Sequence, residues 1–121
     1  MFFVLFVMHD SSKLDAVLSA WEQAGVKGIT ILPSTGMVRI KNHRKALRED
    51  IPLIPRLEDF LRHTENTNRT LFTIVNTEAE ADQVISATES VVGDLDLPHT
   101  GIIAVLPIYK VKGLDRLPGN E

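Results

Sequence analysis

Residues 2–8, FFVLFVM, are seven consecutive apolar residues. The run is too short for a typical helix, and it is rich in Phe and Val, which favour strands. Its apolar side chains do not alternate with polar ones, so both faces of this strand are expected to be covered.

A helix and a second strand are expected after this run. The helix is placed near Ser12–Ala24, between N-cap candidates at Asp10–Ser12 and a possible C′ glycine, Gly25. Its apolar residues recur at the spacing of one helix face: Leu14, Val17, Leu18 and Trp21. Ile29–Leu32 follows as a strand, and Pro33 places it at an edge or a bulge because proline cannot donate a ladder hydrogen bond.

The same order of elements recurs in the second half of the chain. Thr70–Val75 is the third predicted strand, and Thr77 with Glu80 forms a capping box that begins a second helix. This helix ends at Gly93, and its expected buried side consists of Ala81, Val84, Ile85, Thr88, Val91 and Val92. Ile102–Leu106 is the fourth strand.

Two linked β-α-β units predict an α+β fold, the ferredoxin-like βαββαβ sandwich. In that fold a four-stranded antiparallel sheet has both helices on one face. The apolar strands at 2–8 and 102–106 would then expose apolar side chains on the uncovered face, which is unusual for a monomer. We therefore expect a homo-oligomer whose open sheet faces turn inward.

Composition excludes several classes of protein. The chain has 121 residues, no cysteine and a formal net charge of −3. This length suits one domain, and the lack of cysteine removes disulfides and thiolate metal sites. The negative charge argues against a nucleic-acid partner. No apolar stretch is long enough to cross a membrane, so we expect no membrane insertion and a cytoplasmic location.

Residues 37–69 form a long connection for a compact domain, in which connections above about 15 residues are usually functional or disordered. The connection begins with basic residues: Arg39, Lys41, His43, Arg44, Lys45 and Arg48. Ile51–Pro55 is apolar and proline-stiffened, and Leu57–Leu61 is compatible with a helical turn. We divide the chain into one domain, residues 1–112, which contains this connection, and a flexible tail, residues 113–121.

Few residues follow a pattern typical of catalysis or metal binding. No pair of histidines has the spacing of a helical metal motif. Asp10, next to His9, is better explained as a helix cap, and Asp94 with Asp96 as a solvated turn. The sequence therefore predicts a protein that is not an enzyme and has no metal site.

Two glycine-containing turns could approach an anion through backbone N–H groups. They are Ser34–Arg39, which leaves the second strand, and Val92–Gly101, which enters the fourth. The first lies in a stretch that resembles the PII nitrogen-regulatory signalling family. Gly28–Ile31, Thr35–Arg39 and Lys41–His43 are similar to that family's second strand and loop base, without a gap. The resemblance covers roughly residues 2–112.

The resemblance implies a compact homotrimer with inward-facing sheets and an adenine nucleotide, ATP or ADP, in each cleft between subunits. The implied ligand-binding residues are Thr30, Gly36, Met37, Val38 and Arg39 of one subunit, with His99, Thr100 and Gly101 of its neighbour. Lys110 and Lys112 are further candidates for the phosphates. The long connection corresponds to the family's T-loop, which docks on target enzymes, transporters or regulators. Its expected partner-binding residues are Ile51, Leu53, Ile54 and Arg56.

The sequence departs from the family at several ligand positions. Ile102 stands where the family has a phosphate-binding lysine, and Ile40 replaces a glutamine. The spacing of Lys110 and Lys112 also differs from that of the family's basic residues. Each lost charge-assisted contact is worth about 1.5–3 kcal/mol, enough together to abolish ATP binding. The effector is then a different nucleotide, another small anion, or absent.

Other interpretations stay open at this point. The chain could be a ligand-free trimeric docking or assembly protein that uses the connection as a fixed arm. It could instead be a trimeric metal-binding protein of the CutA type, with His9, Asp10 and His99 as candidate ligands. A small enzyme that uses His9 or His99 is the least favoured.

Overall fold

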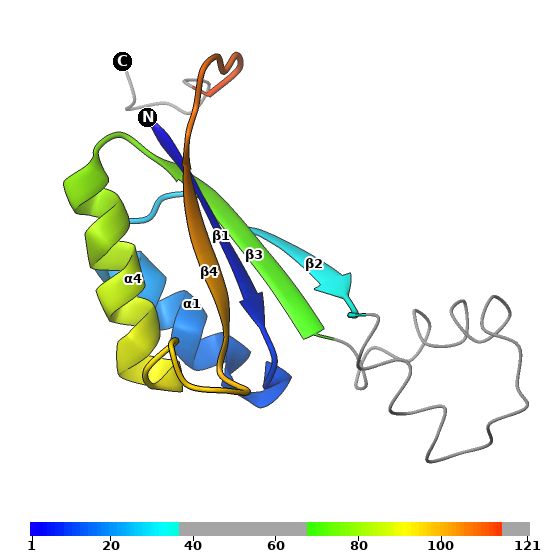
Figure 1. Cartoon of the computed structure of the whole chain (residues 1–121). Coiled ribbons are helices and arrows are strands. Elements are labelled where there is room, and N and C mark those ends of the chain that lie inside the picture. Colours follow the sequence, from blue (N-terminus) through cyan, green and yellow to red (C-terminus); the bar gives the residue numbers. More distant parts are fainter. Residues whose placement is uncertain (37–67, 115–121) are drawn as a thin grey trace, which may run out of the picture.

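The computed structural model describes residues 1–36 and 68–114. These residues contain four strands, two α-helices and one 3-10 turn (Figure 1). In chain order they are β1 (Phe2–Met8), η1 (Ser11–Lys13), α1 (Leu14–Gln23), β2 (Thr30–Ser34), β3 (Asn68–Val75), α4 (Glu78–Val92) and β4 (Gly101–Pro107).

The strands form one antiparallel sheet in the order β2-β3-β1-β4. Strand β1 lies in the middle, and Phe6 pairs with Leu71 on one side and with Ile103 on the other. Both helices lie against one face of the sheet (Figure 1). The predicted ferredoxin-like α+β fold is confirmed, and β2 and β4 are its two opposite edges.

The core lies between the sheet and the helices. Every second side chain of β1 points into it, and Val4, Phe6 and Met8 are fully buried. Trp21 of α1 and Leu71 of β3 are fully buried as well. The predicted buried faces of the helices are confirmed at Val17 and Trp21 of α1 and at Ala81, Val84 and Thr88 of α4. Strand β1 was predicted to be covered on both faces, but the described residues cover only one of them.

Most element boundaries agree with the sequence patterns, and the differences have local causes. Asp10 acts as an N-cap as predicted, but of the 3-10 turn η1 that precedes α1: its carboxylate accepts hydrogen bonds from the Ser12 hydroxyl at 2.6 Å and the Ser12 amide at 3.1 Å. These bonds hold the pKa of Asp10 below its usual value. The residues after this cap form the 3-10 turn, so the α-helix itself begins only at Leu14.

The second half shows similar small shifts. Thr77 caps α4 by accepting from the Glu80 amide at 3.1 Å, and the Glu80 carboxylate accepts from the Asn76 amide at 2.8 Å. Strand β3 begins at Asn68, so it includes the last two residues of the predicted connection. Pro33 lies in edge strand β2, as its missing N–H required.

A buried hydrogen bond joins the two helices. The indole Nε1 of Trp21 donates to the Thr88 hydroxyl at 2.7 Å, and that hydroxyl donates to the Val84 carbonyl oxygen at 2.7 Å. Both Trp21 and Thr88 are fully buried. The helical spacing predicted their burial but could not show that they meet.

Replacing Thr88 with valine is expected to destabilise the fold by about 1–3 kcal/mol, the cost of leaving a buried donor unsatisfied. Valine has nearly the same shape and a similar helix propensity, so the lost hydroxyl dominates. Urea unfolding followed by tryptophan fluorescence measures the change. Ser86→Ala, at an exposed position of α4, is the control, with an expected change below about 0.5 kcal/mol. Equal stability of Thr88→Val and the parent chain would show that the bond contributes nothing.

Candidate functional site

The first group of predicted ligand residues lies along β2. Thr30 begins this edge strand, pairs with Phe72 of β3 and is exposed. Gly36 follows the end of the strand and is also exposed. Between them, the Ser34 hydroxyl lies 2.7 Å from that of Thr70. Met37, Val38 and Arg39 lie outside the described residues.

The second group lies at the entrance of β4, where two residues have positive φ angles. His99 has φ 68° and Gly101 has φ 136°. A Cβ atom at position 101 would lie 2.6 Å from the carbonyl oxygen of Val7 and 2.9 Å from the Phe6 ring. The close approach of β1 to β4 therefore explains the glycine without a ligand. Thr100 is held in the turn by donating its hydroxyl hydrogen to the Leu97 carbonyl oxygen at 2.8 Å.

The turn that leads to β4 uses most of its own backbone donors. The Leu95 amide donates to the Glu89 carboxylate at 3.0 Å, and the Asp96 amide donates to the Asp94 carboxylate at 2.9 Å. The Leu97 amide donates to the Asp94 carbonyl oxygen at 3.1 Å, and the next residue is a proline. An anion at this turn would meet carboxylates and few available N–H groups, so the turn is a poor phosphate cradle.

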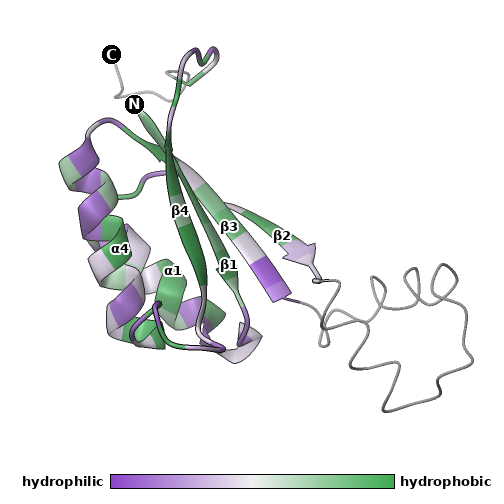
Figure 2. Ribbon diagram, in the orientation of Figure 1, coloured by the Kyte–Doolittle hydropathy of each residue, from purple (hydrophilic) through white to green (hydrophobic). Residues whose placement is uncertain are grey.

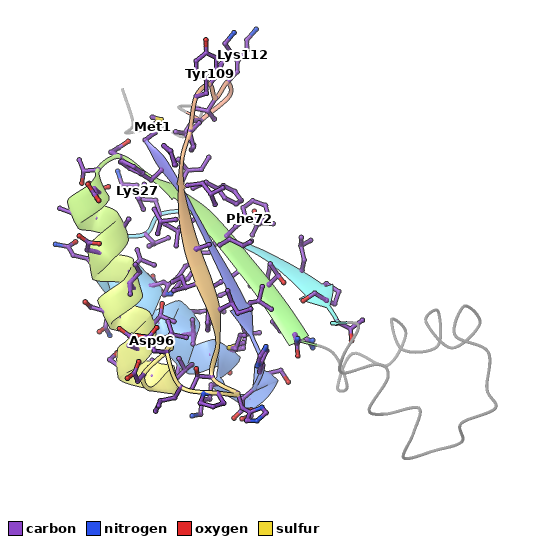
Figure 3. All side chains as sticks on the ribbon, viewed as in Figure 1. Met1, Lys27, Phe72, Asp96, Tyr109 and Lys112 are labelled. Carbon is purple, nitrogen blue, oxygen red and sulfur yellow. The ribbon has the colours of Figure 1, made fainter. Side chains whose placement is uncertain are left out.

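The third group, Lys110 and Lys112, lies beyond the other end of β4. Strand pairing between β1 and β4 ends with Phe2 opposite Pro107, and the Ile108 amide then donates to the Met1 carbonyl oxygen at 3.0 Å. After this bond the chain runs past the sheet, and Tyr109 and Lys112 point away from it (Figure 3). Both lysines are exposed.

We call residues 109–112 the C-terminal arm. Its apolar side chains, Tyr109 and Val111, alternate with the two lysines. Tyr109 is 98% exposed and Val111 is 38% exposed. The sequence patterns indicated a role for the two lysines but not an exposed arm. The alternation of apolar and basic residues after the fourth strand could have indicated it.

One chain cannot bring the three groups together. Strands β2 and β4 are opposite edges of the sheet, so Thr30 and His99 lie far apart. Gly101 begins β4 and Lys110 lies beyond its other end, and at about 3.3 Å per residue the strand spans roughly 20 Å. A site that contained members of all three groups would need more than one copy of the chain.

The sheet face opposite the helices is a large apolar surface. Cross-strand pairing gives this open face three side chains from each of β1, β3 and β4: Phe3, Leu5, Val7, Thr70, Phe72, Ile74, Ile102, Ala104 and Leu106. Ile102 is 63% exposed and Leu106 is 48% exposed. The rings of Phe3 and Phe72 pack at a centroid distance of 5.1 Å. Figure 2 shows that β1 and β4 are hydrophobic along most of their length.

The geometry gives little support to a metal site or a membrane-spanning helix. Among the described residues no group of three or more His, Asp or Glu side chains could hold a metal ion, and this includes His9, Asp10 and His99. No helix in the described ranges is long and apolar enough to cross a membrane. The predicted partner-binding residues Ile51, Leu53, Ile54 and Arg56 lie outside the described part of the chain.

Comparisons with known proteins agree with this architecture. A family model described as "Nitrogen regulatory protein P-II" matches residues 4–115. A solved structure of a PII-like signaling protein from Thermus thermophilus is similar, with a TM-score of 0.53 and 22% sequence identity. The match covers 87% of this chain and 83% of that one. No curated protein sequence gives a significant match.

Proposed function

The chain belongs to the P-II nitrogen regulatory protein family, and from that membership we propose that it is a non-enzymatic regulator that forms a homotrimer. Each cleft between subunits would bind a small effector, and residues 37–69 would bind a target protein. The absence of cysteine suits action in the reducing cytoplasm.

The observation that supports this proposal most strongly is the open sheet face. Its apolar side chains have no cover within the described part of the chain, and patches of this size on soluble proteins usually mark interaction surfaces. A symmetric trimer with inward-facing sheets would bury the face and would give a reason for the continuous apolar run of β1.

The separation of the predicted ligand residues also supports a site between subunits. Thr30 and Gly36 lie at one edge of the sheet, and the turn before β4 lies at the other. In a closed ring of identical subunits, one edge of each copy can face the opposite edge of the next. A ligand between them would contact two chains at once and could bias residues 37–69 toward a partner-binding conformation.

Sedimentation of the full-length chain tests the assembly. We expect the mass of a trimer at micromolar concentration, because the open face is too apolar to stay in water. A single species with the mass of one chain would overturn the proposed trimer.

Calorimetric titration of that trimer with Mg-ATP tests the effector class. Saturable binding, with one site per subunit, would support an adenine nucleotide. If the titration releases no heat and the melting temperature does not change, ATP is excluded and the effector is another small ligand.

A deletion variant tests the partner-binding role of the long connection. Deletion of Ile51–Pro55 is expected to abolish capture of the target and leave the trimer intact. Unchanged capture by the deletion variant would contradict a docking role for this segment.

A further inference from the structure

The turn before β4 carries negative charge and contains no lysine or arginine. Residues 70–109 include six acidic residues and neither of these two basic types. Asp94 and Asp96 are exposed in the turn, and the Glu89 carboxylate reaches it by accepting from the Leu95 amide. Proteins bind phosphate groups with cationic side chains and unpaired N–H groups. The turn side of the proposed cleft therefore repels a phosphate rather than binding it.

Ile102 lies beside this turn, where β4 begins. It is 63% exposed, and its pairing with Val7 places it on the open face. An isoleucine side chain offers apolar surface and can neither donate a hydrogen bond nor neutralise a charge. In the same chain the lysines of the C-terminal arm lie beyond the other end of the strand. The entrance of β4 thus combines negative charge with apolar surface.

The opposite side of the proposed cleft, at β2, has no charge in its described residues, since residues 28–36 contain neither acidic nor basic side chains. Thr30 is exposed, and Phe72 pairs with it from the neighbouring strand, so the hydroxyl and the ring share one face (Figure 3). Leu32 follows on this face and is 47% exposed. Aromatic rings stack on planar heterocycles, and a hydroxyl can donate to or accept from their polar atoms. This side suits an uncharged ring compound.

We infer that the effector of the proposed cleft is an uncharged compound of the nucleoside class, and that Asp96 and Ile102 exclude nucleotides with several phosphates. The ring stacks on Phe72, and the Thr30 hydroxyl hydrogen-bonds to it. The inference rests on the proposed trimer and its clefts, and it adds the chemical class of the effector and the residues that select it.

The test compares two probes, adenosine and Mg-ATP, which share one ring system and differ in their phosphates. Each probe is titrated calorimetrically at low salt into the full-length chain, after sedimentation has shown that the chain is a trimer. We expect adenosine to bind with one site per subunit. Its Kd should be at least about tenfold below that of Mg-ATP, because a missing charge-assisted contact weakens phosphate binding by about that factor or more.

A double variant, Ile102→Lys/Asp96→Asn, tests which residues exclude the phosphates. It adds a cation where β4 begins and removes one negative charge from the turn, at two positions that are exposed in the single chain. We expect its Kd for Mg-ATP to fall by about tenfold or more, while its Kd for adenosine stays unchanged. Asp82→Asn/Ser86→Lys is the matched control, because it makes the same change of charge at exposed positions of α4 and should alter neither Kd.

Two variants on the β2 side test the contact with the ring. Phe72→Leu removes the aromatic surface and should raise the Kd for adenosine by about tenfold, which is within the range measured for stacking of one base on an aromatic side chain. Thr30→Val removes the hydroxyl at nearly constant shape and should also weaken adenosine binding. Sedimentation checks that each variant is still a trimer, and Thr30→Val carries the test if Phe72→Leu dissociates.

The outcomes separate this inference from the proposed function. If the parent trimer binds Mg-ATP as tightly as adenosine, or does not bind adenosine, the inference is overturned and the trimer stands. An unchanged Kd for Mg-ATP in the double variant would contradict the role of Asp96 and Ile102. A parent chain that is monomeric would instead overturn the proposed trimer itself.

Discussion

Gly101→Ala is expected to destabilise the protein by about 2–5 kcal/mol, from a strained backbone together with a steric clash. Position 101 has φ 136°, which residues with a Cβ rarely adopt. The added Cβ would also lie 2.6 Å from the Val7 carbonyl oxygen and 2.9 Å from the Phe6 ring. The oxygen is held in the pairing of β1 with β4, so it cannot move away without breaking the sheet.

Two further glycine variants separate the contribution of backbone strain from that of the steric clash. Gly25 has φ 97° but no atom within 4 Å of an added Cβ, so Gly25→Ala keeps only the backbone strain. Gly28 has neither a positive φ nor a close neighbour, so Gly28→Ala should be nearly neutral. Urea unfolding of the three variants should rank their losses in the order 101, 25, 28. A loss at position 101 no larger than that at position 25 would show that β1 and β4 yield to the added atom.

Leu106→Asp is expected to dissociate the proposed trimer into folded monomers. Leu106 pairs with Phe3 on the open face and is 48% exposed, so a single chain can solvate a carboxylate there. In the trimer the same carboxylate would be buried against other copies, at a cost of several kcal/mol for each ion. The concentration at which half of the trimer dissociates should rise by about a thousandfold or more, since each 1.4 kcal/mol is a factor of ten.

Ser86→Asp is the matched control for this variant. Ser86 is exposed on α4, which lies against the covered face of the sheet, so its carboxylate stays in water in the single chain and in the trimer. Ser86→Asp should therefore remain a trimer. Sedimentation measures the mass, and far-ultraviolet circular dichroism checks that each variant is folded. A trimeric Leu106→Asp protein would mean that the open face is not the contact surface.

Local sequence patterns predicted the elements because short-range rules define them. The bounds of the first strand were confirmed, since an uninterrupted apolar run that is followed by polar His9 and Asp10 leaves little choice. The caps at Asp10 and Thr77 were also confirmed, because each involves residues only two or three positions apart. The start of the first helix shifted by two residues because a 3-10 turn came first.

The candidate site was less predictable for a physical reason. That Thr30, His99 and Lys110 meet in one cleft between subunits stays a prediction, since within one chain they occupy opposite edges and ends of the sheet. Resemblance identifies residues, but strand order decides which of them can meet. The acidic turn around Asp96 and the exposed arm around Tyr109 became visible only through their hydrogen bonds and exposure.

The sequence by itself thus determined the type and order of the strands and α-helices in residues 1–36 and 68–114, because apolar periodicity and capping act over a few residues. It also determined that an apolar sheet face needs cover, because two helices can shield only one side. Only the tertiary structure decided the contacts between distant segments, such as Trp21 with Thr88 and Gly101 with Val7. Such contacts depend on strand order, register and helix placement, which the whole chain sets together when it buries its core.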